Sequence, residues 1–145
     1  MAIKRYVADA DTTITNAFRE NLTTRGSASN MGRADSLEVC SIYGQESSGS
    51  SELSRILVSF PTSDIATDRT NGVIPASGSV SFYLRMFNAE TPFTVPRNFT
   101  LVASAVSGAQ LANGTPIDFA WQEGQGIDMD SYTDLGVCNW VSSSK

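Results

Sequence analysis

The chain has 145 residues, the length of one domain and enough to bury a core without a metal ion or a disulfide. Its net charge is -5, which argues against binding to the backbone of nucleic acids as its main role. It has no histidine, which excludes Ser-His-Asp and Cys-His catalytic sites and removes the commonest metal ligand.

No stretch approaches the ~20 apolar residues that a membrane helix needs, and the opening MAIKRYVADAD lacks the apolar region of a secretion signal. We therefore expect synthesis in a cytoplasm and no membrane association. Cys40 and Cys138 lie far apart without CxxC spacing, so no zinc site is predicted. Two reduced thiols are favoured over a disulfide, because the chain is made in a reducing compartment. We expect no cofactor.

The first half of the chain predicts three strands. Residues 3–15 (IKRYVADADTTIT) alternate large and small side chains, whereas the polar residues 16–35 contain Gly, Asn and Asp and predict a loop. Period-2 patterning predicts a second strand over 36–44. The most apolar strand, 53–60 (LSRILVSF), ends before Pro61, which cannot donate to a continuing ladder.

The second half continues the pattern after a long connection, in which SDIATD predicts one helical turn with Ser63 as its N-cap. Residues 79–90 predict the longest strand, with large side chains on both faces, and 98–106 and 116–121 predict further strands. Short strands without a helix of ten residues predict an all-β fold, an antiparallel β-sandwich that forms a single domain over 1–145.

Acidic residues offer the remaining enzymatic hypothesis. Glu123, beside Trp121 in AWQEGQG, could form a glycosidase pair with Asp128 or Asp130 if the carboxylates lay ~5–9 Å apart. The sequence does not fix that separation, and a structural corner is favoured. Asp128, Asp130 and Asp134 loosely resemble a calcium loop, but the glycine and the terminal acid are missing at the expected offsets. A solvated acidic turn is therefore favoured, and no metal site is predicted.

Arg55 lies among apolar neighbours in its predicted strand, so we expect it to pair with a carboxylate such as Glu123, with ligand contact as the alternative. Exposed aromatic residues could stack on a sugar or on a partner protein. The candidates for ligand or partner contact are Tyr43, Tyr83 and Trp140.

Five motifs in order give the chain a resemblance to the DNRLRE domain, and the strand VSFYLRMF is one of them. The other four motifs fall on Asp11 and Ile14; Asn30, Gly32, Leu37 and Val39; Arg55, Leu57 and Phe60; and Trp121, Glu123 and Gly124. Each motif alone is weak, and their common order is moderately specific.

The resemblance implies a jelly roll similar to carbohydrate-binding modules. Relatives occur on secreted bacterial enzymes and cell-wall proteins, and those that start at Met without a signal peptide resemble virion structural proteins of tailed phages. It implies a non-enzymatic protein located in the virion, which contacts other virion proteins as a homo-oligomer or in multiple copies. The alternatives are a carbohydrate-binding module that recognises a cell-surface glycan and, less favoured, a polysaccharide-cleaving enzyme.

The resemblance also implies that WQEGQG is a structural turn. In it, Trp121 packs at a sheet edge, Glu123 meets a buried partner, and Gly124 and Gly126 adopt positive φ. One departure is that relatives continue beyond the NW pair with strands that close the sandwich, whereas this sequence reads NWVSSSK. We therefore expect a sandwich lacking its last strands, completed near residues 136–142 by further chain or by a partner.

Overall fold

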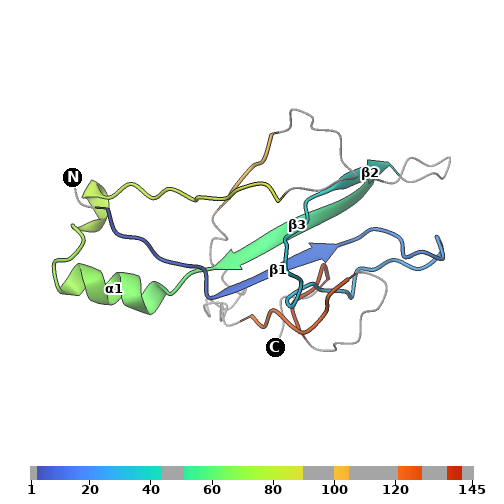
Figure 1. Ribbon diagram of the computed structural model, residues 1–145, viewed down its shortest axis with the longest axis horizontal. Coiled ribbons are helices and arrows are strands. Elements are labelled where there is room, and N and C mark those ends of the chain that lie inside the picture. Colours follow the sequence, from blue (N-terminus) through green and yellow to red (C-terminus); the bar gives the residue numbers. More distant parts are fainter. Residues whose placement is uncertain (1–2, 44–50, 90–99, 105–120, 129–136, 142–145) are drawn as a thin grey trace, which may run out of the picture. The chain divides into compact units, whose positions relative to one another are not determined.

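The structure is a computed structural model that describes residues 3–43, 51–89, 100–104, 121–128 and 137–141. Its regular elements are three strands, one α-helix and one short 3-10 helix. In chain order they are β1 (Ala10–Thr15), β2 (Ser41–Tyr43), β3 (Ser51–Ser59), α1 (Thr62–Thr70) and η1 (Ser77–Ser79) (Figure 1).

The three strands form one antiparallel sheet in the order β1-β3-β2. Thr12 pairs with Leu57, and Ile42 pairs with Glu52. The β-branched run TTIT in β1 favours extended backbone. The strands predicted over 3–15 and 53–60 are therefore present, but β1 begins only at Ala10 and β3 begins two residues early, at Ser51.

The strand predicted over 36–44 is mostly absent, because only Ser41–Tyr43 form β2. Hydroxyl groups take the place of ladder partners just before it. The backbone N–H of Glu38 donates to Thr13 Oγ1 at 2.9 Å, and that of Cys40 donates to Ser54 Oγ at 2.7 Å. One backbone hydrogen bond, from the N–H of Ser54 to the carbonyl of Cys40 at 3.0 Å, adds to these contacts. The segment is thus attached to the sheet largely through hydroxyl side chains, which a period-2 pattern does not reveal.

The prediction of the longest strand over 79–90 is wrong for its described residues. Ser79 belongs to η1, and residues 80–89 run as an extended segment outside any strand (Figure 1). A strand needs partners for its N–H and C=O groups, and this segment pairs with no described strand. Residues 100–104 also carry no strand, and the rest of 98–106 and residues 116–120 lie outside the described residues.

Helix α1 is longer than the single turn predicted from the sequence, and Pro61 rather than Ser63 is its N-cap. Asp64 in the first turn and Arg69 in the last complement the helix dipole. No residue of α1 is buried, and a helix this short is marginal in water by itself. Its position therefore depends on contacts with other segments.

The buried residues other than glycine are mostly polar, and four of them lie in β1. They are Thr12, Thr13, Ile14, Thr15, Ala17, Ser29, Asn30, Met31, Glu52, Ser54, Ile74 and Cys138. Buried hydroxyl groups need hydrogen-bond partners, and Thr15 Oγ1 finds one by donating to the carbonyl of Leu53 at 2.8 Å. This interior is specified by hydrogen bonds as much as by apolar contact.

By contacts the chain divides into two compact units, one formed by Met1–Phe82 with Trp121–Lys145 and the other by Tyr83–Ala120. The sheet and α1 belong to the first unit. A β-sandwich requires a second sheet, and the described residues contain one sheet. The jelly-roll fold and the single domain therefore stay predictions.

Candidate functional site

Two of the sequence motifs, the one with Asn30 and Gly32 and the turn WQEGQG, meet at the side chain of Asn30. This side chain is only 1% exposed. Its Oδ1 accepts hydrogen bonds from the backbone N–H of Gly126 at 3.1 Å and of Gly32 at 3.4 Å. A β-bridge between Asn30 and Ile14 attaches the same residue to β1. Two motifs far apart in sequence are thus two halves of one buried junction.

Glycine is required at this junction chiefly by close approach. A side chain on Gly32 would overlap the backbone carbonyl of Glu123, and one on Gly126 would overlap the backbone carbonyl of Asn30. Gly124 has a φ of +83°, as predicted, and also lies against the Asn30 amide. Gly126 does not have a positive φ, so that prediction is wrong. Glycine is required there because the backbone of Asn30 leaves no room for a side chain.

Glu123 meets a backbone group rather than a cation. Its Oε2 accepts a hydrogen bond from the N–H of Asp11 in β1 at 3.0 Å, and its side chain is half-buried. The carboxylate therefore satisfies an N–H at the side of β1 that does not face β3. The expected ion pair between Glu123 and Arg55 is absent from the described residues.

A second carboxylate, that of Glu52, also accepts a hydrogen bond from a backbone N–H, beyond the other end of β1. The sequence did not identify it as a candidate. Glu52 is 8% exposed, and its Oε2 accepts a hydrogen bond from the N–H of Phe18 at 2.8 Å. Beside it, Asn16 Oδ1 accepts from the N–H of Leu53 at 2.7 Å. In the sequence Glu52 ends the serine-rich stretch QESSGSSE, and only the register of β3 shows that it faces the interior.

Arg55 is exposed, and its guanidinium carbon lies 4.6 Å from the ring centroid of Trp140. This cation–π contact replaces the predicted carboxylate partner, since an exposed guanidinium can stay hydrated while it stacks on an aromatic ring. The backbone N–H of Trp140 donates to the carbonyl of Ser27 at 3.1 Å. Because Arg55 stacks on the Trp140 ring, one face of that ring is already occupied.

The remaining predicted site residues are scattered. Phe60 is half-buried directly after β3, and Tyr83 is 89% exposed in the extended segment. The backbone of Tyr43 ends β2, but its side chain lies outside the described part of the chain. A common contact site of Tyr43, Tyr83 and Trp140 therefore stays a prediction.

An open groove of about 420 Å³ borders the junction. Its lining residues are Asp9, Ala10, Trp121, Gln122, Glu123, Gly124, Gln125 and Val137. Asp128 is half-buried and does not line the groove, while Asp130 and Asp134 lie outside the described residues. The groove therefore offers a half-buried tryptophan, two carboxylates and amide groups to a small polar molecule.

The described residues contain no group of three or more Cys, Asp or Glu that could hold a metal ion. Cys40 and Cys138 are both free thiols, so the disulfide alternative is not realised. Burial raises the pKa of the Cys138 thiol, which disfavours its reactive thiolate. No helix within the described ranges is long and apolar enough to cross a membrane.

Residues 80–89 form an exposed segment rich in apolar side chains, and every one of them except the half-buried Val80 is exposed. Its large exposed side chains are Phe82, Tyr83, Leu84, Met86 and Phe87, of which Phe87 is 93% exposed. Scattered exposed apolar residues are ordinary, whereas a continuous run of them marks an interaction surface.

Comparison of the chain with protein-family models, curated proteins and solved structures found no match. The resemblance to the DNRLRE domain therefore rests on the five sequence motifs.

Proposed function

We propose that this protein is a non-enzymatic structural component of a tailed-phage virion, which acts by docking on other virion proteins in multiple copies. The observation that carries the docking role is the extended, exposed apolar segment over residues 80–89. The resemblance in sequence supplies the class of assembly.

The segment has the properties of a strand that has no partner among the described strands. Large side chains alternate on both of its faces, so as a strand it would need cover above and below. Its backbone forms no ladder with the described strands. An extended segment of this kind binds by adding a strand to the edge of another sheet, where main-chain hydrogen bonds give affinity and side chains give specificity.

The junction around Asn30 supports a scaffold role for WQEGQG. Asn30 is enclosed, and the glycines around it leave no space for a side chain, let alone a ligand. The two carboxylates that bracket β1 accept hydrogen bonds from backbone N–H groups of the same chain. These residues therefore stabilise the unit that contains the sheet.

The test removes apolar surface from the segment without touching the junction. In a phage whose own copy of the gene is deleted, we would supply the chain with Phe87→Ser or with the matched exposed change Arg85→Ser. We expect Phe87→Ser to abolish incorporation into particles and Arg85→Ser to retain it. Equal incorporation of both variants would contradict docking through this segment.

A carbohydrate-binding module is the second candidate, and the groove beside Trp121 is the observation that favours it. Ligand sites often combine an apolar or aromatic wall with a few polar groups, and the volume of the groove is in the usual range of ~300–1,000 Å³. Glycan-array binding that is lost on Gln122→Ala, an exposed change, would support it. If no glycan on the array binds, the docking role is the remaining candidate.

A further inference from the structure

The leading segment, residues 3–9, precedes β1 and belongs to no helix or strand (Figure 1). Tyr6 and Ala8 are half-buried, and its other residues are exposed. Ile3 and Val7 are 81% and 83% exposed, whereas Tyr6 between them is half-buried. The segment therefore has an inner face toward the protein, on which Tyr6 lies, and an outer face of mixed character on which Ile3, Arg5 and Val7 are exposed.

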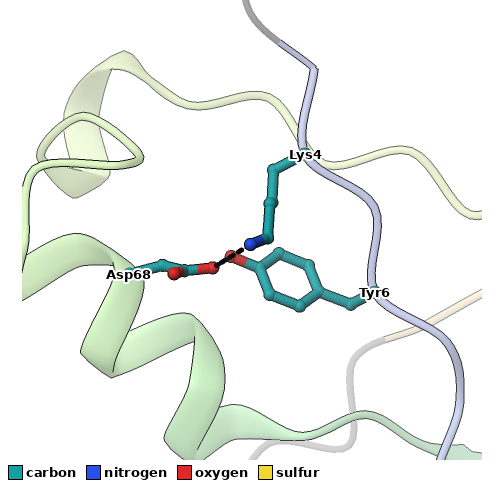
Figure 2. A network of polar contacts seen from close by, with 3 residues as sticks. All are labelled: Lys4, Tyr6 and Asp68. Atoms are coloured by element: carbon teal, nitrogen blue, oxygen red, sulfur yellow. Dashed lines mark hydrogen bonds and ion pairs between the residues drawn. The ribbon is translucent and has the colours of Figure 1, made fainter.

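One carboxylate on α1 holds the inner face. The hydroxyl of Tyr6 donates to Asp68 Oδ2 at 2.7 Å, and Lys4 Nζ lies 3.0 Å from the same oxygen (Figure 2). Among the described residues, these are the side-chain hydrogen bonds and ion pairs made by residues 3–8. The next attachment is backbone pairing, where the N–H of Asp9 donates to the carbonyl of Ser59 at 3.1 Å.

Titration does not release this contact near neutral pH. The Tyr6 hydrogen bond and then the Lys4 ammonium lower the pKa of Asp68, so the contact forms fully above the ordinary carboxyl range. Desolvation, the hydrogen bond to Asp68 and the charges of Asp68 and Asp64 raise the pKa of Tyr6 to about 12, and the charge of Arg69 opposes them. The phenol therefore keeps its proton until strongly alkaline pH. A cation or hydrogen-bond donor that competes for Asp68 would displace the segment at neutral pH.

We propose that the leading segment exchanges between copies of this chain, so that Lys4 and Tyr6 of one copy bind Asp68 of another. The ammonium and the carboxylate are complementary, and every copy carries both. No residue of α1 is buried, but the Asp68 side chain is only 17% exposed in its contact with Lys4 and Tyr6, so a second copy can reach it once the segment of its own chain has detached. The exchanged contacts are the same as the original ones, which makes such swapping a low-cost route to association.

The concentration of the chain determines whether the segment binds Asp68 of its own chain or of another copy. Within one chain a short connection holds the segment near Asp68 at an effective concentration on the order of millimolar. Exchange therefore becomes competitive where copies are concentrated, as in an assembly. The inference goes beyond the proposed function, because it concerns contacts between copies of this chain alone and is tested on purified protein without particles.

Charge reversal distinguishes exchange from an internal contact. Lys4→Glu and Asp68→Lys each put like charges at the contact within their own chain, whereas the two variants mixed can form the pair only between chains. We expect light scattering to show a dimer in the equimolar mixture that neither variant forms alone. The variant that carries both changes on one chain can again form the pair internally, as the wild type does. A mixture that scatters as the average of its components would overturn the proposal.

A crosslinking experiment covers the case in which charge reversal disturbs folding. In a Cys40→Ser background, chains with Lys4→Cys are mixed with chains carrying Asp68→Cys or, as the matched control, Arg69→Cys on the same exposed helix. Disulfide-linked dimers that form faster with position 68 than with position 69 support exchange. Equal rates at both positions would contradict it.

Discussion

The side-chain oxygen of Asn30 accepts a hydrogen bond from the backbone N–H of Gly126, which lies 96 positions further along the chain, at 3.1 Å. This contact ties the loop after β1 to the WQEGQG turn. Because Asn30 also bridges to Ile14 of β1, the turn is placed against the sheet by the same residue. The following predictions test this junction, its flanking carboxylates and the surface contacts around them.

Gly32→Ala is expected to destabilise the protein strongly, because the added methyl group would overlap the carbonyl of Glu123. Overpacking of this kind costs about 1–3 kcal/mol or more of unfolding free energy. Urea unfolding followed by circular dichroism measures the change. Gly78→Ala is the control, since a methyl group there meets nothing within 4 Å. If the two variants unfold at the same urea concentration, the junction is not packed as described.

Glu52→Ala is expected to lower the unfolding free energy by about 1.5–3 kcal/mol, the range for a hydrogen bond to a charged group. It removes the acceptor for the Phe18 N–H. Glu52→Gln retains an acceptor oxygen and should lose less. Glu38→Ala, at an exposed side chain, serves as the control in thermal unfolding. A Gln variant as unstable as the Ala variant would show that charge, rather than the hydrogen bond, matters.

Arg55→Ala is expected to cost only about 0.5–1 kcal/mol, the range for an exposed cation–π contact. A buried ion partner would instead make the loss of one member of the pair cost about 3–5 kcal/mol. The variant should also change the fluorescence of Trp140, because the guanidinium leaves the ring. Arg33→Ala, another exposed arginine, should leave the fluorescence unchanged. A loss in the larger range would restore the ion-pair interpretation.

Sequence patterns located β1 and β3 because short-range alternation and β-branched residues determine them directly. They also identified Asn30, Gly32, Glu123 and Gly124, which the structure brings together, although not the atoms through which these residues touch. Patterns failed where a partner decides the structure. Residues 80–89 alternate as a strand does, but alternation does not supply a neighbouring ladder. Arg55, expected to pair with a carboxylate, is exposed, whereas Glu52 is enclosed, because strand register rather than residue type decides which side chain faces the interior.

Tyr6 is expected to titrate near pH 12, because its pKa is raised to about 12 by desolvation and by the Asp68 carboxylate. A raised pKa means that the contact stabilises the protein below the ordinary tyrosine range and that this stability is lost as pH rises through about 12. Asp68→Asn should return the pKa of Tyr6 toward 10, as followed by NMR of its ring carbons. An unchanged titration in that variant would mean that Asp68 does not contact the phenol.

We propose that this chain is a virion component that docks through residues 80–89. The most direct measurement combines mass spectrometry of purified particles of the encoding phage with hydrogen exchange of that segment, in the particle and in the isolated chain. We predict that the chain is present in multiple copies per particle and that the amides of Phe82 to Phe87 exchange rapidly in isolation and slowly in the particle. Absence of the chain from particles, or equally rapid exchange in both states, would contradict the account.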